Sequence, residues 1–311
     1  MTDNVAGSIG YRSDPPPSFE TAAGPCPAFE VLSPPRPTAP FVFSSPHSGR
    51  AYPLEFLQAS RLGSEAIRRS EDLFVDQLFD FVPALGAPLL HARFPRAFLD
   101  LNREPFELDP RMFAEELPSF VNTSSVRVAG GLGTIPRIVA EREDIYRSKL
   151  TVAEGLERIE RYYVPYHDTL SRLLRDTQAR FGLAILIDCH SMPSTVRTLP
   201  GGRRPDIVLG DRFGTSASSR IVGLFAGHLA ERGYDVALNK PYAGGYITER
   251  YGRPAAGLHC IQIEINRGLY ADERRFVPHE GLAELRRRLS EVVAKLVMDV
   301  TIEWERPAAA E

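Results

Sequence analysis

The sequence has little cysteine: Cys26, Cys189 and Cys260 are its three thiols in 311 residues. They form neither an even set nor a C-x-x-C pair. This spacing excludes a disulfide framework and a thiolate zinc knuckle as the basis of the fold. We expect all three cysteines to be reduced.

The sequence also lacks a long apolar run and an excess of basic charge. No segment approaches the roughly 20 apolar residues needed to cross a bilayer, and the first residues lack a basic-then-apolar leader pattern. The formal net charge is -3, so there is no concentrated basic surface for binding phosphates. We therefore expect a cytoplasmic protein whose partner is a small-molecule substrate, not a nucleic acid or a membrane. Its oligomeric state stays open.

The composition is that of a globular chain, with 43% hydrophobic and 25% charged residues. This length is enough for one large α/β domain, or for at most two smaller ones. Nine prolines in the first forty residues exclude a regular helix or a central strand there. We predict an extended, proline-rich arm over 1–40 and a single domain over 41–311, with a loop-rich insertion at about 104–150.

Apolar runs and helical periods alternate through the rest of the chain. Runs typical of strands occur at 41–45, 89–99, 183–187, 206–210, 235–239 and 259–266, and helical periods at 64–81, 152–180, 216–232 and 280–304. Gly182 and Gly233 follow two of these helices as stop signals. Strands and helices that alternate in this way predict a three-layer α/β/α domain.

Several polar side chains stand where predicted strands end. His47, His190 and Glu264 follow or close such runs, and functional groups gather at the carboxyl ends of strands in open α/β sheets. Two histidines and a carboxylate are enough to hold Zn²⁺ with one position left for water. A single histidine past a strand is more often a hydrogen-bonded loop residue, so position alone leaves both interpretations open.

Four blocks of sequence resemble the N-formylglutamate amidohydrolase family. They are SPHSG at 45–49, DLNR at 100–103, DCHSMP at 188–193, and NKPYAGGYIT at 239–248 followed by QIEINR at 262–267. The resemblance covers about 41–275. It implies a fold similar to that of zinc carboxypeptidases and aspartoacylases, with a mixed, mostly parallel sheet of about eight strands flanked by helices.

The resemblance implies that His47 and His190 are zinc ligands and that a carboxylate is the third. The carboxypeptidase relatives supply this carboxylate three residues after the first histidine, where the present chain has Arg50, a residue that cannot bind a cation. The family has an acidic residue at the helix that follows, and Asp72 fits that place better than Glu71. Either carboxylate could instead belong to a solvated helix face.

Glu264 is the general base that the resemblance implies: it takes a proton from the attacking water and passes it to the leaving nitrogen. Its alternative role is an ion pair with Arg267 or Arg103. We expect Arg103 to be catalytic together with Glu264, because an arginine near the zinc would stabilise the negative charge that develops on the amide oxygen.

The resemblance also implies where substrate binds. Asn102 and Arg103 hold a substrate carboxylate, for which a planar guanidinium is well suited. Arg96, Arg137 and Arg250 are candidates for the second acid group of a dicarboxylate. Further candidates for substrate contacts are Gly245, Tyr246 and Thr248, although this segment could equally be an ordinary tight turn.

The function implied is zinc-dependent hydrolysis of the amide of an N-acyl amino acid, with N-formyl-L-glutamate giving formate and L-glutamate as the first choice. One alternative is a related zinc amidohydrolase or carboxypeptidase that acts on another N-acyl amino acid or a peptide. Another is a ligand-binding homologue that has lost the chemistry. The identity of the native metal and of the acyl group stays open.

Overall fold

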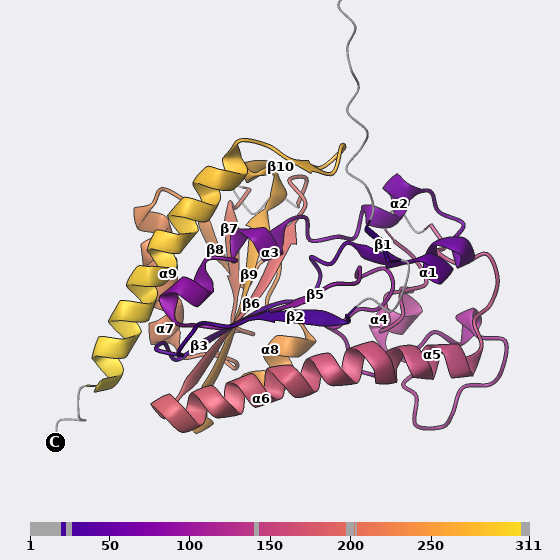
Figure 1. Cartoon of the computed structure of the whole chain (residues 1–311), viewed down its shortest axis with the longest axis horizontal. Coiled ribbons are helices and arrows are strands. Elements are labelled where there is room, and N and C mark those ends of the chain that lie inside the picture. The colour runs from indigo at the N-terminus through magenta and orange to yellow at the C-terminus, as the bar shows by residue number, and fades with distance from the viewer. Residues whose placement is uncertain (1–19, 23–26, 140–142, 197–201, 203, 306–311) are drawn as a thin grey trace, which may run out of the picture.

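The computed structural model describes residues 20–22, 27–139, 143–196, 202 and 204–305. In these residues a seven-stranded sheet forms the centre of the molecule (Figure 1). Its order is β2 (Phe29–Leu32), β5 (Leu89–Ala92), β3 (Phe41–Ser45), β6 (Ala184–Met192), β9 (Leu258–Asn266), β7 (Ile207–Gly210) and β8 (Val236–Leu238). The pairs β2–β5 and β7–β9 are antiparallel and the other four are parallel. The predicted mixed, mostly parallel sheet is confirmed, with seven described strands in place of about eight.

Helices cover both faces of this sheet. On one face lie α3 (Val75–Leu78), α7 (Ser219–Glu231) and α9 (Gly281–Glu305), and on the other lies α6 (Val164–Phe181) (Figure 1). Shorter helices are α1 (Leu54–Ala59), α2 (Ser64–Arg68), α4 (Val126–Ala129), α5 (Val152–Arg158) and α8 (Tyr246–Tyr251). Two-stranded pairs join β1 (Glu20–Ala22) to β4 (Ala51–Pro53) and β10 (Ala271–Asp272) to β11 (Val277–Pro278). The three-layer α/β/α arrangement is therefore confirmed.

The alternation of side chains along the central strands divides the core into two layers. In β6, Ile185 and Ile187 join the cluster under α7 and α9, whereas Leu186 joins the cluster under α6. All three are fully buried. A strand covered on both faces needs apolar residues at every position, which is why this strand is a continuous apolar run in the sequence.

The helix predicted at 152–180 is present as one nearly continuous element. It begins with a capping box between Thr151 and Glu154 and ends at Gly182, which has a positive φ of 79°. A π-helical turn, η4 (Ile159–Tyr163), joins α5 to α6. The apolar stripe of this helix, with Tyr166, packs on the sheet.

The single helix predicted over 64–81 is a wrong prediction. The structure has α2 and α3 with a break between them, and Phe74 takes a left-handed φ of 56°. Tertiary contacts hold the break open, because the N–H of Asp72 donates to the carbonyl of His47 at 3.1 Å. The extended segment predicted to reach 99 also ends early, since β5 stops at Ala92 and turns follow.

The N-terminal and inserted segments are partly described. Residues 1–19 and 23–26 of the predicted arm lie outside the described residues, but β2 already belongs to the sheet as an edge strand. The segment 104–150 contains α4 and the 3₁₀ turn η2 (Pro110–Met112), and its apolar side chains pack into the cluster under α6. None of the described helices combines the length and the apolar character that crossing a bilayer requires.

Candidate metal centre and active site

Three buried side chains from different elements meet at the carboxyl edge of the sheet. His47 follows β3, Asp72 lies in the break between α2 and α3, and His190 lies in β6. One ligand atom from each can be chosen so that all three lie within 4.8 Å of one another. Oδ2 of Asp72 is 2.8 Å from Nδ1 of His190 and 3.5 Å from Nδ1 of His47. Two imidazole nitrogens and a carboxylate oxygen therefore face a common point.

The opposite nitrogen of each imidazole is held by another carboxylate. Nε2 of His47 is 2.8 Å from Oδ1 of Asp100, and Nε2 of His190 is 3.0 Å from Oδ2 of Asp188. A carboxylate in this position fixes the tautomer and the orientation of a metal-binding histidine. Both Nδ1 atoms are thereby directed at the carboxylate of Asp72.

The electrostatics of the centre follow from this dense packing of charge. Burial disfavours the charged form of Asp100, but Arg103, Arg96 and His47 outweigh it and hold its pKa well below the usual range. Burial likewise opposes the charge on His190, but Asp188 and Asp72 raise its pKa well above that of a free imidazole. The site is thus built to attract positive charge between its carboxylates.

The residues present fit a metal ion. Nδ1 of His47 is buried and has no hydrogen-bond partner among the described residues, and such an atom is costly unless something binds it. Two histidines and one carboxylate are a ligand set that catalytic zinc sites use, with a position left for water or substrate. The same two observations, an orphaned ring nitrogen and a matching donor set, point to one metal position at this centre.

Glu264 lies beside His190. The two residues are in register on the neighbouring parallel strands β6 and β9, so their side chains project from the same face of the sheet. Nε2 of Gln262 donates to Oε1 of Glu264 at 2.8 Å. Burial raises the pKa of Glu264 to about 7, and the charge of Asp72 adds to this shift. A carboxyl group with that pKa can accept and return a proton near neutral pH.

A cavity of about 630 Å³ opens over this centre. Its lining includes Asp72, Arg96, Asp100, Glu264 and Arg267. The inserted segment forms another part of the wall, with Gly130, Leu132, Pro136, Ile138 and Val139. The cavity is large enough for a small organic ligand.

Comparison with known proteins agrees with this geometry. Residues 39–271 match the family model of N-formylglutamate amidohydrolase. The chain belongs to this family. The match includes all three residues of the candidate metal centre together with Glu264 and Arg267.

Individual members of the family, and one more distant structure, are similar along most of the chain. An N-formylglutamate deformylase from Pseudomonas putida is 31% identical over 88% of this chain and 97% of its own length. The crystal structure of N-formylglutamate amidohydrolase from Ralstonia eutropha JMP134 superposes with a TM-score of 0.82 at 37% identity, covering 88% of this chain and 99% of the other. A structure from Agrobacterium tumefaciens shares the fold, with a TM-score of 0.58 at 19% identity over 88% of this chain and 96% of its own.

The predicted residues of the DLNR block and its neighbour differ in their placement. Arg96 lines the cavity and donates from Nε to Asp100 at 2.9 Å. Arg103 donates to the backbone carbonyls of Leu132 and Asn102 at 3.0 and 2.8 Å. The Asn102 amide is buried and engaged on both sides: its oxygen accepts from the Ile247 N–H at 2.7 Å, and its nitrogen lies 3.2 Å from Nε2 of His190. Carboxylate binding by Asn102 and Arg103 stays a prediction.

The glycine-rich segment packs behind the centre. The N–H of Gly245 donates to Oε1 of Gln262 at 2.8 Å, and a Cβ at Gly245 would lie 2.5 Å from the Asn102 amide. Thr248 is fully buried and donates to the carbonyl of Gly245 at 2.6 Å. The Tyr246 hydroxyl accepts a hydrogen bond from Arg250. These contacts hold the start of α8 against Asn102 and Gln262, and direct contact with substrate stays a prediction for Gly245, Tyr246 and Thr248.

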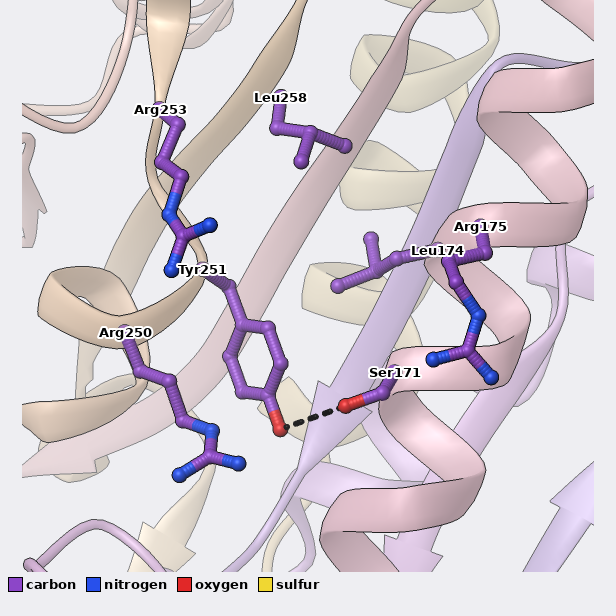
Figure 2. A pocket seen from close by; sticks show the side chains of 7 residues that line it. All are labelled: Ser171, Leu174, Arg175, Arg250, Tyr251, Arg253 and Leu258. Carbon is purple, nitrogen blue, oxygen red and sulfur yellow. Dashed lines mark hydrogen bonds between the residues drawn. The ribbon is translucent and has the colours of Figure 1, made fainter. Parts of the chain in front are cut away.

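Two of the predicted arginines lie away from the 630 Å³ cavity. Arg137 is paired with Asp109 and Asp144. Arg250 lines a separate cavity of about 450 Å³ beside Tyr251 and the helix α6 (Figure 2). The structure does not bring these two guanidinium groups together with Glu264, and their role in binding the substrate also stays a prediction.

Sequence reasoning missed several members of the site. Asp188 could have been found, because a residue two positions before His190 on a strand projects from the same face. Asp100 gave a weaker signal as the first residue of the DLNR block. The side chain of Glu71 lies outside the centre, where it accepts hydrogen bonds from Tyr52 and Arg68.

Proposed function

We propose that this chain is a zinc-dependent amidohydrolase that converts N-formyl-L-glutamate and water into formate and L-glutamate. The observation that carries the proposal is the convergence of His47, Asp72 and His190 next to a cavity that Asp72 and Glu264 line, in a chain that belongs to the N-formylglutamate amidohydrolase family. The relatives in two Pseudomonas species carry the name N-formylglutamate deformylase.

His47, Asp72 and His190 would hold the metal. When bound, zinc lowers the pKa of water towards neutrality and polarises the carbonyl of the amide. Asp100 and Asp188 orient the two imidazoles, because their carboxylates accept hydrogen bonds from the Nε2–H groups and leave the Nδ1 atoms to face a metal. The protein thus supplies a buried site at the end of the sheet whose side chains are held in place by one another.

Glu264 moves the proton. It accepts a proton from the attacking water and delivers it to the nitrogen of the scissile amide, so that the C–N bond breaks and the amino acid leaves as an amine. Gln262 holds the carboxylate in place from the neighbouring position on the same face of β9. The buried position suits this role, because burial keeps the proton affinity of Glu264 close to neutral pH.

Arg96 supplies positive charge for the α-carboxylate of the substrate. Asp100 engages only its Nε among the described residues, which leaves the terminal nitrogens for a ligand in the cavity. A guanidinium binds a carboxylate with two parallel hydrogen bonds. Arg103 adds positive charge nearby, because its Nε lies 3.5 Å from Oδ2 of Asp100, the same oxygen that accepts from Arg96.

The test is a substrate panel with purified protein. N-formyl, N-acetyl and N-succinyl forms of glutamate and aspartate, together with short peptides, are offered to zinc-loaded and chelated enzyme, and release of the free amine is measured. The proposal predicts the highest kcat/KM for N-formyl-L-glutamate and its loss after chelation. Faster hydrolysis of another N-acyl group or of a peptide would replace the proposed substrate.

A further inference from the structure

Arg267 lies in the catalytic cavity at the end of the strand that carries Glu264. It begins the 3₁₀ turn η6 (Arg267–Leu269) directly after β9, and its side chain is 10% exposed. It lines the 630 Å³ cavity together with Glu264 and Tyr242. Arg267 is therefore a largely buried residue in the wall of the space in which a substrate would bind.

The hydrogen-bond donors of Arg267 are not satisfied within the part of the chain that the structure describes. Its Nε is buried without a partner. The nearest carboxylate is that of Glu273, 4.0 Å from Nη1, and Oε1 of Glu273 already accepts from the Ser194 N–H at 2.9 Å. A buried guanidinium without close hydrogen-bonded partners is expensive. This cost is removed if a ligand brings a carboxylate into the cavity.

The order of the strands places Arg267 at the far side of the metal centre from Arg96. Along the sheet the order is β5, β3, β6, β9, and these strands lead to or carry Arg96, His47, His190 and Arg267 in turn. In strand order, the two histidines thus stand between the two arginines, which both line the cavity. A substrate whose amide lies at the histidines can extend one carboxylate towards each arginine.

We propose that Arg267 binds the side-chain carboxylate of the substrate and so selects N-acyl amino acids that carry a second acid group. This inference rests on the proposed hydrolysis of N-formylglutamate. It assigns the specificity for a dicarboxylate to a residue outside the Asn102–Arg103 pair, with Arg96 binding the α-carboxylate.

The experiment compares three substrates with matched enzymes. They are N-formyl-L-glutamate, N-formyl-L-glutamine, which has an amide in place of the side-chain carboxylate, and the α-amide of N-formyl-L-glutamate. Arg267→Gln should lower kcat/KM for N-formylglutamate by roughly 10- to 100-fold, the value of a lost charge-assisted pair. It should change kcat/KM for N-formylglutamine by less than about threefold, because that substrate never offered the partner. Arg267→Lys keeps the charge without the planar guanidinium, so its kcat/KM for N-formylglutamate should lie between the values of wild type and Arg267→Gln.

The control is Arg274→Gln, an exposed arginine seven positions further along the chain. It should leave all three kcat/KM values unchanged. Zinc content and melting temperature are measured for every variant, so that loss of the fold is separated from loss of binding. If Arg267→Gln does not fold, Arg267→Lys carries the comparison.

Two results would overturn the proposal. An equal loss of kcat/KM on all three substrates would mean that Arg267 acts on the scissile amide or only supports the fold. A loss that persists on N-formylglutamine and vanishes on the α-amide would place the α-carboxylate at Arg267 instead.

A wild-type enzyme that hydrolyses none of the three compounds would refute the proposed function and leave Arg267 to be judged by binding. In that case binding of N-formylglutamate and N-formylglutamine is measured by calorimetry with and without Arg267→Gln. Loss of preference for the dicarboxylate supports the inference, and unchanged preference contradicts it.

Discussion

The two imidazoles of the metal centre are each held from both sides. Asp72 lies near both Nδ1 atoms, while Asp100 and Asp188 bind the two Nε2 atoms. Five side chains from four places in the sequence therefore form one unit in which each group holds its neighbour in position. Effects of substitutions within such a unit are not additive, but the role of each member can be separated by the property that changes.

Asp72 and Glu71 are adjacent carboxylates with different surroundings. Asp72→Ala should lower zinc affinity far more than Glu71→Ala, because only the Asp72 carboxylate faces both histidines. Glu71→Ala should instead cost about 1 to 3 kcal/mol of stability, since it removes the buried carboxylate that accepts hydrogen bonds from the Tyr52 hydroxyl and from Arg68. A competition titration with a chromogenic chelator measures the zinc affinities, and denaturant unfolding measures the stabilities. The reverse order of zinc affinities would remove Asp72 from the ligand set.

Asp188 acts on the metal through His190. Asp188→Asn keeps the size of the side chain but no longer supplies a carboxylate to Nε2 of His190, so zinc affinity should fall by about 10- to 100-fold. Asp206→Asn is a matched control, because Asp206 bonds the Asp235 backbone N–H instead of a histidine. Equal zinc affinities for the two variants would mean that Asp188 does not orient the ligand.

Glu264 should make the metal-free protein less stable above neutral pH. Its folded-state pKa is raised from 4.5 to about 7, so the folded state binds a proton more tightly than the unfolded chain. The free energy of unfolding of the metal-free protein is therefore highest below about pH 4.5, where Glu264 is protonated in both states. It falls as the pH rises from there to about 7, because the unfolded chain ionises Glu264 more easily. Glu264→Gln cannot ionise and should be more stable than wild type at pH 8, by up to about 3 kcal/mol, but not at pH 4.5.

The measurement is chemical unfolding of chelated protein at the two pH values. The same substitution should abolish most of the hydrolysis, which would make Glu264 a residue that the enzyme keeps at the expense of stability. A stability difference that is equal at both pH values would contradict the raised pKa.

At the scale of elements, the approach of the glycine-rich loop to β7 depends on Gly210. A Cβ at this position would lie 2.6 Å from the backbone of Ala243, so Gly210→Ala must displace the loop that carries Gly245 and α8. We expect a loss of about 1 to 3 kcal/mol in stability and a lower kcat/KM. Gly227→Ala is the control: this glycine is exposed on α7 with open space around its Cβ, and the change should stabilise by about 0.5 to 1 kcal/mol. Similar unfolding midpoints for the two variants would refute the close approach.

Helices and strands could be predicted where the pattern of apolar residues in the sequence matches the faces that the structure buries. The helix at 152–180 has a long apolar stripe with a stop signal at Gly182, and β6 is an uninterrupted apolar run because both of its faces are covered. The break between α2 and α3 was not predictable, because the contact that opens it joins Asp72 to His47, which is distant in the sequence. Local periodicity carries no information about such a contact.

The same distinction applies to the candidate site. The histidines and Glu264 could be proposed because they stand in sequence blocks that resemble the family, whereas their positions at the ends of apolar strands left other interpretations open. Arg267 was assigned at most an ion-pair role, because an unpaired guanidinium is recognised only when its surroundings are known. The ion pairs of Arg137 with Asp109 and Asp144 could not be predicted from the sequence for the same reason.

At the scale of the whole molecule, two hydrophobic layers hold the sheet rigid while its carboxyl edge carries the chemistry. The helices that pack on these layers are α7 and α9 on one face and α6 on the other (Figure 1), and none of their described residues lines the cavity. The inserted segment anchors itself in the layer under α6 and then contributes Leu132 and Ile138 to the cavity wall. Substrate size is therefore expected to depend on this insertion more than on the sheet.

Metal reconstitution tests metal-dependent hydrolysis most directly. Purified enzyme is stripped with a chelator, zinc is returned in steps, and the rate of formate release from N-formyl-L-glutamate is followed together with bound zinc. We predict that stripped enzyme is inactive and that activity returns in proportion to bound zinc, with a break at about one equivalent per chain. His190→Ala should show no such break. Full hydrolysis by stripped enzyme, or full recovery by His190→Ala, would contradict a catalytic metal held by His47, Asp72 and His190.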